Sequence, residues 1–255
     1  MRDTATKKTI AILGAGGRMG SGIARSLART GYRVLLSDES ENGLLLASER
    51  LPFLLGQIKI GVPQADVEIA TSLREASWEG DIVIPTVPYE VQAEVASKIK
   101  DVVTGKIVIS TTNPLKKTCD GLLTPPTTSA AEELAQHLPH SKIVKAFNTI
   151  FPAQIERPTV AGTNVDVFVA GDDREAVSTV VELVKDAGFN PVLVGGLAMS
   201  RTLENMMVLL ISLSARNHYL GPVGWKVVHD TTDQIEQGQL DTNPIEDERN
   251  GPSRH

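Results

Sequence analysis

The stretch TIAILGAGGRMGSGIARSLARTGYRVLLSD, residues 9–38, decides the fold of this protein. It begins with the apolar run IAIL, turns through a cluster of glycines, and continues as a helical pattern up to Gly31. A second strand-like run at residues 32–36 then leads to Asp38. A strand, a glycine-rich turn, a helix and a second strand within about thirty residues are the layout of a dinucleotide-binding βαβ unit.

The glycines explain how such a unit binds its ligand. They permit a tight turn and let backbone N–H groups approach a pyrophosphate, whose charge the N-terminus of the following helix favours. The spacing is irregular, because Gly14, Gly17 and Gly20 fit a GxxGxxG pattern as well as Gly14 and Gly16 fit the usual one. An acid at the end of the second strand can accept hydrogen bonds from a ribose. We predict nucleotide binding here; the alternative is a tight turn that holds no ligand.

The composition is ordinary for a globular protein. Of 255 residues, 41% are hydrophobic and 22% are charged, and the net charge is -6, so we expect no nucleic-acid partner. The longest strongly apolar stretch, residues 206–211, is too short to cross a bilayer, and the polar N-terminus shows no targeting signal. The single cysteine, Cys119, excludes an internal disulfide. We expect a cytoplasmic protein with no membrane partner.

Strands and helices alternate after residue 38. We expect helices at residues 41–55, 90–100, 130–136 and 173–186. We expect strands at residues 67–70, 81–84, 106–109, 142–146, 165–170 and 191–194. Residues 115–129, rich in Thr and Pro, are expected to form a surface loop. This rhythm predicts an α/β protein of the Rossmann type, with a doubly wound, mainly parallel sheet and a small C-terminal helical element.

The segment 197–217 differs from the earlier helices, because its apolar residues cover more than one stripe. A helix of this kind is buried nearly all round, so we expect it to pack on its own domain and on a partner subunit, giving a homodimer. The end of the chain is polar and acidic, and we expect disorder there. We therefore divide the chain into a dinucleotide-binding Rossmann domain (1–195), a C-terminal helix and closing segment (196–228) and a tail (229–255).

The chemistry is expected in the loops that follow the strands, because a doubly wound sheet binds its ligand across the carboxyl ends of its strands. These loops are residues 14–20, 37–40, 86–89, 112–114 and 147–149. They offer hydroxyls, amides and backbone groups, but no histidine and no metal-ligand cluster. A metal site, or a nucleophile with its base, therefore does not fit. Hydride transfer does fit, because the cofactor supplies the reactivity and the protein supplies orientation.

Six segments carry a resemblance to a known family. They are LGAGGRMGSGIARSLARTGYRV, DIVIPTVPYEV, GKIVISTTNPL, SAAEELAQHLPHSKIVKAFNTI, DVFVAGDDREA and GGLAMSRTLENMMVLLISLSARN. With them the chain resembles the F420-dependent NADP oxidoreductases, and KAFNT followed by VAGDD is the most specific part. The resemblance implies that NADP sits on the first βαβ unit and that the deazaflavin coenzyme F420 enters from the C-terminal side. The enzyme would pass a hydride between them, as a dimer or larger assembly.

The resemblance also assigns residues by position. It implies that the pyrophosphate is held by the glycine turn, which comprises Gly14, Ala15, Gly16, Gly17, Arg18, Met19 and Gly20. Val87 and Pro88 would border the nicotinamide ribose. The nicotinamide end would be lined by Asn113, Ala146, Phe147 and Asn148. The segment 197–203 would close over the second ring system.

One position departs from the family. Where its members have a Gly-Ser-Arg type of ending on the second strand, which binds the 2′-phosphate of NADP, this chain has Ser37, Asp38 and Glu39. A carboxylate there favours a free ribose 2′-hydroxyl, and two like charges at about 4 Å cost on the order of 1–4 kcal/mol. The sequence therefore favours NAD over NADP, with Arg18 or Arg33 as side chains that could restore NADP binding.

Two other functions stay open from the sequence. Reduction or oxidation of a small ketone, imine or acid by NAD(P) would need a proton donor near the transferred hydride. The polar candidates for that catalytic role are Tyr89, Asn148, Ser200 and His218. The other function is a sensor that holds NAD without turnover, which the sparse site and the acidic tail would permit.

Overall fold

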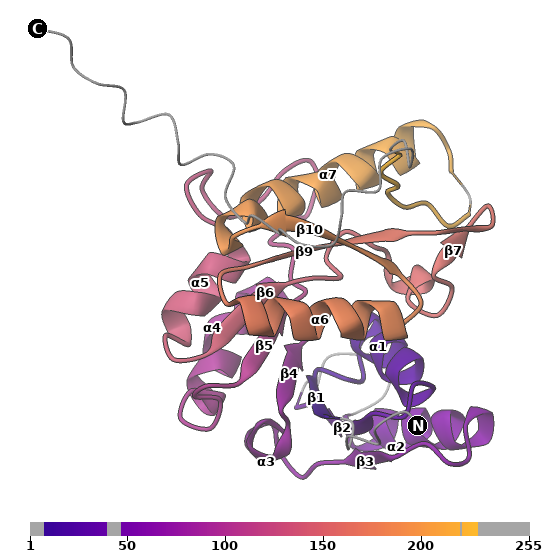
Figure 1. Ribbon diagram of the computed structural model, residues 1–255, viewed down its shortest axis with the longest axis vertical. Coiled ribbons are helices and arrows are strands. Elements are labelled where there is room, and N and C mark those ends of the chain that lie inside the picture. Colours follow the sequence, from indigo (N-terminus) through magenta and orange to yellow (C-terminus); the bar gives the residue numbers. More distant parts are fainter. Residues whose placement is uncertain (1–7, 40–46, 220, 229–255) are drawn as a thin grey trace, which may run out of the picture. The chain divides into compact units, whose positions relative to one another are not determined.

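An eight-stranded sheet organises the structure, a computed structural model that describes residues 8–39, 47–219 and 221–228 (Figure 1). The strands are β1 (Thr9–Leu13), β2 (Arg33–Ser37), β3 (Val67–Ile69), β4 (Ile82–Pro85), β5 (Ile107–Ser110), β6 (Lys142–Lys145), β9 (Asp166–Gly171) and β10 (Asn190–Gly195). Their order across the sheet is β10-β9-β6-β5-β4-β1-β2-β3. The described residues up to Trp225 belong to one compact unit, and residues 226–228 belong to a second.

The strands from β3 to β6 all run parallel, which confirms the Rossmann-type, mainly parallel sheet. At one edge the direction reverses, because β9 pairs antiparallel with β6 and β10 pairs parallel with β9. The reversal has a local cause. The chain between β6 and β9, all of it described, forms only the short helix η1 (Pro152–Gln154) and the hairpin of β7 (Thr159–Val160) and β8 (Thr163–Asn164). A parallel connection needs a long crossover, which is usually an α-helix.

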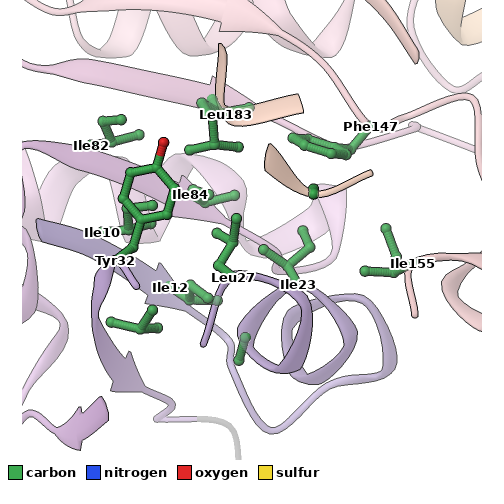
Figure 2. Packing of buried hydrophobic residues seen from close by; sticks show 14 of the residues in the cluster. Ile10, Ile12, Ile23, Leu27, Tyr32, Ile82, Ile84, Phe147, Ile155 and Leu183 are labelled. Atoms are coloured by element: carbon green, nitrogen blue, oxygen red, sulfur yellow. The ribbon is translucent and has the colours of Figure 1, made fainter. Parts of the chain in front are cut away.

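Helices cover both faces of the sheet. They are α1 (Arg18–Ala28), α2 (Ala47–Gly61), α3 (Leu73–Glu79), α4 (Tyr89–Ile99), α5 (Ala130–His137), α6 (Arg174–Asp186), the short helix η2 (Leu197–Met199) and α7 (Ser200–Arg216). Ile10 and Ile12 of β1 pack with residues of α1, α2 and α6, and Figure 2 shows part of this cluster. Ala11 and Leu13 pack on the opposite face with residues of α3, α4 and α5. Because both faces of the sheet are covered, β1 is a continuous apolar run without alternating polar residues.

The C-terminal helix α7 packs on the reversed edge of the sheet (Figure 1). Its Leu203 joins Phe168 of β9 in a third buried cluster. On the same helix, Leu209 is 50% exposed and Leu213 is 36% exposed. One stripe of α7 is therefore buried within the chain, and another apolar stripe faces outward.

Most of the expected strands and helices lie close to their expected bounds, and residues 115–129 form a loop with one isolated bridge. Part of the helix expected at 41–55 and the tail 229–255 lie outside the described residues. The hairpin β7–β8 and the helix η1 are additions that the sequence did not predict. Within the described ranges, no helix is both long enough and apolar enough to span a membrane.

Candidate functional site

The glycine turn between β1 and α1 leaves no room for side chains. Gly14 has a φ of +83°, and its N–H donates to the carbonyl oxygen of Ser37 over 2.8 Å. A Cβ atom on Gly20 would lie only 2.5 Å from the carbonyl oxygen of Gly14. Gly17, the N-cap of α1, provides no capping side chain for the N–H groups of the first helical turn. The N–H groups of residues 14–17 are thus used inside the protein, and the uncapped N–H groups of the first turn of α1 are the donors of this glycine cradle. A close-packed glycine turn leading into such a helix N-terminus is the arrangement that binds a pyrophosphate.

The remaining residues of the turn have different surroundings. The N–H of Ala15, which is buried, also donates to the carbonyl oxygen of Ser37, over 3.1 Å. Arg18 is the exposed first residue of α1, and Met19 packs against the core. Of these side chains, Arg18 is therefore the one that faces solvent at the mouth of the cradle.

The end of β4 lies against this cradle, because β4 is the neighbour of β1 in the sheet. The hydroxyl of Thr86 donates to the carbonyl oxygens of Leu13 and Gly14, over 2.9 and 3.0 Å. A Cβ atom on Gly14 would lie 3.1 Å from Cγ1 of Val87, and Pro88 follows as the N-cap of α4. Strand order reverses between β1 and β4, and this is the point where doubly wound sheets bind their ligands.

Asp38 follows β2 directly and reaches back to the glycine turn. Its Oδ2 atom accepts a hydrogen bond from the N–H of Gly16 over 3.0 Å and lies 3.7 Å from Nη2 of Arg50. The Asp38 side chain is 3% exposed and the Arg50 side chain is 16% exposed. Glu39 has a different partner, because its carboxylate pairs with Lys98 of α4 over 2.9 Å. Of the two acids, Asp38 is thus the one that faces the cradle.

The expectation that Arg33 could restore NADP binding is wrong. Arg33 begins β2, so it lies at the opposite end of that strand from Asp38. There it pairs with Glu68 over 2.9 Å and with Glu79 over 2.8 Å. A cation that the sequence did not predict, Arg50 of α2, lies beside the Asp38 carboxylate instead.

The loops after β5 and β6 meet through two asparagines. Asn113 donates through Nδ2 to the backbone carbonyl of Asn148 over 2.8 Å, and Asn148 donates through Nδ2 to Oδ1 of Asn113 over 2.9 Å. The same Nδ2 of Asn148 donates to the carbonyl oxygen of Leu203 in α7 over 3.0 Å. Oδ1 of Asn148 is buried and accepts no hydrogen bond from any described residue. The loops and the start of α7 therefore form one connected unit.

Phe147, which directly precedes Asn148, has an unusual backbone conformation. It is buried, next to buried Ala146, with a φ of +62°. Its ring packs edge-on against Phe189, with the centroids 6.2 Å apart, and its place in the core is seen in Figure 2. A bulky residue rarely adopts a positive φ, and backbone strain of this kind clusters at functional sites.

A fully buried ion pair lies one residue before Ala146. Nζ of Lys145 is 2.6 Å from Oε1 of Glu204 and also donates to the carbonyl oxygen of Thr112 over 2.5 Å. Oε2 of Glu204 accepts a hydrogen bond from the N–H of Ala130 over 3.1 Å. Burial lowers the pKa of Lys145, and the Glu204 carboxylate opposes that shift. The pair ties β6, the loop after β5, α5 and α7 together at the carboxyl edge of the sheet.

Tyr89, Ser200 and His218, three of the candidate proton donors, have different surroundings. The hydroxyl of Tyr89 donates to Glu133 over 2.8 Å, and burial together with that carboxylate raises the pKa of Tyr89 to about 12. Ser200 is buried, and its hydroxyl has no partner among the described residues. His218 is exposed beyond the far end of α7, a helix that separates it from Ser200 by about 25 Å. The described residues also contain no group of His, Cys, Asp and Glu suited to a metal ion.

Three charged residues at this site were not predicted from the sequence: Arg50, Lys145 and Glu204. For two of them a signal existed, because Lys145 stands in the apolar strand KIVKAF and Glu204 in the apolar helix LENMMVLL. A charge inside a segment that must be buried needs a partner, so such pairs can be sought in a sequence. Arg50 carries no such signal, because its contact with Asp38 depends on where α2 packs.

Comparisons with known proteins agree with this geometry. A family model described as coenzyme F420-dependent NADP oxidoreductase matches residues 9–114. An F420-dependent NADP reductase of Methanocaldococcus jannaschii is 32% identical over 212 residues, which cover 81% of this chain and 92% of that protein. The F420-dependent NADP reductase of Methanothermobacter marburgensis is 28% identical, over 82% of this chain and 93% of its own length.

A solved structure shares the fold. The crystal structure of a proposed F420-dependent NADP reductase from Arthrobacter sp. FB24 superposes with a TM-score of 0.75 at 22% identity, covering 87% of this chain and 100% of that one. Sequence similarity carries the family assignment, because the M. jannaschii protein is matched over nearly its whole length. The chain therefore belongs to the F420-dependent NADP reductases, a family of oxidoreductases.

Proposed function

We propose that this protein transfers a hydride between NADP(H) and the deazaflavin coenzyme F420, the reaction that gives its relatives their name. The observation that carries the proposal is the row of loops at the carboxyl ends of the neighbouring strands β1, β4, β5 and β6. These loops hold the glycine cradle, Val87 and the hydrogen-bonded pair of Asn113 and Asn148. A dinucleotide bound across a doubly wound sheet extends along this edge.

The cradle fits the pyrophosphate end of a dinucleotide. A Cβ atom on Gly14, Gly16 or Gly20 would come within 3.1, 2.5 and 2.5 Å of neighbouring atoms, so only glycine lets other groups approach the backbone here. The uncapped first turn of α1 adds N–H donors and the positive end of the helix dipole. Val87 and Pro88 would border the ribose on the nicotinamide side.

The asparagine loops fit the nicotinamide end. When bound there, the nicotinamide dinucleotide supplies the hydride, and the chain orients it and excludes water. Asn113, Ala146, Phe147 and Asn148 would line that end, and the buried Oδ1 of Asn148 has acceptor capacity for an amide N–H. The segment 197–203 would close over the deazaflavin, starting at Leu197, whose N–H donates to Asp172 over 2.8 Å.

The placement of the polar side chains favours the deazaflavin over a small ketone or imine. A ketone needs an acid beside the carbon that receives the hydride. Tyr89 and His218 do not meet that need, since Tyr89 donates to Glu133 and His218 lies beyond α7. Asn148 and Ser200 carry an amide and an alcohol, which are weak acids. A conjugated ring system spreads the incoming charge and depends less on an enzyme acid.

Two finer features are part of the proposal. NADP is favoured over NAD, because the relatives are NADP reductases and because Arg50 compensates the charge of Asp38. A homodimer forms through 197–217, since α7 presents Leu209 and Leu213 to the outside. The cytoplasmic location and the division of the chain at residues 195 and 228 stay predictions.

The test is to mix the purified protein with NADPH and oxidised F420 and to follow the absorbance of the oxidised deazaflavin. We expect deazaflavin reduction that depends on the protein and is faster with NADPH than with NADH. A parallel reaction without F420, but with a panel of small ketones and imines, should show no loss of NADPH. Turnover of a panel member without any deazaflavin reduction would overturn the proposal.

A further inference from the structure

The contact between Gly16, Asp38 and Arg50 joins three separate elements beside the glycine cradle. A Cβ atom on Gly16 would lie 2.5 Å from Oδ2 of Asp38 and 3.2 Å from Nε of Arg50. Gly16 comes from the turn, Asp38 from the end of β2 and Arg50 from α2. Both side chains therefore lie directly against the backbone of the cradle at Gly16.

This position corresponds to the adenosine ribose of a bound dinucleotide. In a βαβ nucleotide site, the acid after the second strand reads the ribose 2′-hydroxyl, and an arginine nearby accommodates a 2′-phosphate. Here both groups are present and in contact, with Oδ2 of Asp38 3.7 Å from Nη2 of Arg50. The guanidinium is planar and presents several donors, which suits it to a phosphate better than an ammonium.

The other charged residues considered around the cradle pair with other side chains or are exposed to solvent. Glu39 pairs with Lys98, and Arg33 pairs with Glu68 and Glu79 at the far end of β2. Arg18 is exposed at the first position of α1, on the pyrophosphate side. Among the residues that the structure describes, Arg50 is thus the cation placed against Asp38.

We propose that Arg50 determines the specificity of the site for the 2′-phosphate, and that it acts by compensating the negative charge of Asp38. The inference rests on the proposed function in that it assumes a dinucleotide in the cradle. With Arg50 present, the pair carries no net charge, and the guanidinium donates to the 2′-phosphate. Without Arg50, the Asp38 carboxylate keeps the hydrogen bond from the N–H of Gly16 but loses the guanidinium, so it repels a 2′-phosphate and favours a free ribose hydroxyl.

The test is nucleotide binding by the full chain, measured by titration calorimetry at fixed ionic strength with NADP+, NAD+, adenosine 2′,5′-bisphosphate and AMP. Arg50→Gln should lower the affinity for NADP+ and for the bisphosphate by about tenfold or more, which is the size of one lost close charge interaction. Its affinity for NAD+ and AMP should stay close to that of the wild type. The NADP+ affinity of Arg50→Lys should lie between that of the wild type and that of Arg50→Gln, because lysine keeps the charge but loses the planar donor arrangement.

A double variant separates compensation from a general loss of structure. Adding Asp38→Asn to Arg50→Gln should restore part of the NADP+ affinity, because the opposing carboxylate is gone. Arg74→Gln is the matched control, since Arg74 of α3 pairs with Asp101 on the surface and the change removes the same charge. It should leave all four affinities unchanged.

The outcomes distinguish this inference from the proposed function. If Arg50→Gln weakens NADP+ and NAD+ equally, or weakens neither, Arg50 does not read the 2′-phosphate and the inference is overturned. If the variants behave as expected but F420 is not reduced, the inference stands and the proposed reaction fails. Binding of no dinucleotide by the wild-type chain would overturn both.

Discussion

At the scale of single residues, Gly20 and Gly56 show how surroundings decide what a glycine does. Both lie in helices, but a Cβ atom on Gly20 would meet the Gly14 carbonyl at 2.5 Å and the Ala15 Cα at 2.8 Å, whereas nothing lies within 4 Å of one on Gly56. The atoms that Gly20 would meet include backbone, which cannot rotate away. Gly20 thus sets how closely α1 approaches the turn.

We predict opposite effects for the same substitution at these two sites. Gly20→Ala should lower the free energy of unfolding by about 1–3 kcal/mol, because the added methyl overpacks the turn. Gly56→Ala should raise it by up to about 1 kcal/mol, because alanine has the higher helix propensity. Urea denaturation of both variants measures this. A Gly20→Ala variant as stable as the wild type would show that α1 can shift outward without cost.

At the scale of elements, the buried pair of Lys145 and Glu204 holds α7 to the sheet. Its two side chains come from β6 and α7, and both are fully buried. Removing one partner leaves an uncompensated charge in the interior, which typically costs about 3–5 kcal/mol. The contact between α7 and the sheet should therefore weaken when one partner is removed.

We predict strong coupling between these two positions. Lys145→Met alone should destabilise the protein by about 3–5 kcal/mol, because Glu204 is left buried and charged. The double variant Lys145→Met with Glu204→Gln should recover part of that loss, because no net charge remains. The control is the exposed pair of Lys185 and Glu182 on α6, where the same exchanges should cost less than about 1 kcal/mol. Additive losses at the buried pair would contradict the prediction.

At the scale of the whole molecule, the outward stripe of α7 is the surface proposed for self-association. Leu209 is 50% exposed and Leu213 is 36% exposed on a helix whose other side packs on the sheet. Association is stabilised when a second copy of the chain covers apolar surface of this kind and removes it from water. The proposed homodimer predicts a molecular mass twice the 27.4 kDa of one chain.

We predict that Leu209→Glu with Leu213→Glu shifts the protein from dimer to monomer in analytical ultracentrifugation. The change places charges where the partner's apolar side chains would pack, so association should weaken strongly. Ile60→Glu serves as the control, because Ile60 of α2 is 85% exposed and lies outside the proposed interface. A wild-type chain that sediments as a monomer would refute the dimer.

The sequence predicted the fold because the relevant signals are local. The glycine turn, the apolar runs of the parallel strands and the helical patterns between them each lie within a short stretch. The ends of those strands also identified the loops that contain Gly14, Val87, Asn113 and Asn148. The reversal of β9 and β10 was not predicted, because the segment between β6 and β9 has no strong periodic pattern.

By itself, the sequence determined a Rossmann-type nucleotide fold and its family, and it marked Asp38 as the residue that departs from that family. Only the tertiary structure decided what Asp38 means, because Arg50 reaches it from another element. The same holds for Lys145 and Glu204, which are 59 residues apart in the chain and 2.6 Å apart in space. Charge compensation depends on which side chains meet after packing, and no local pattern encodes that.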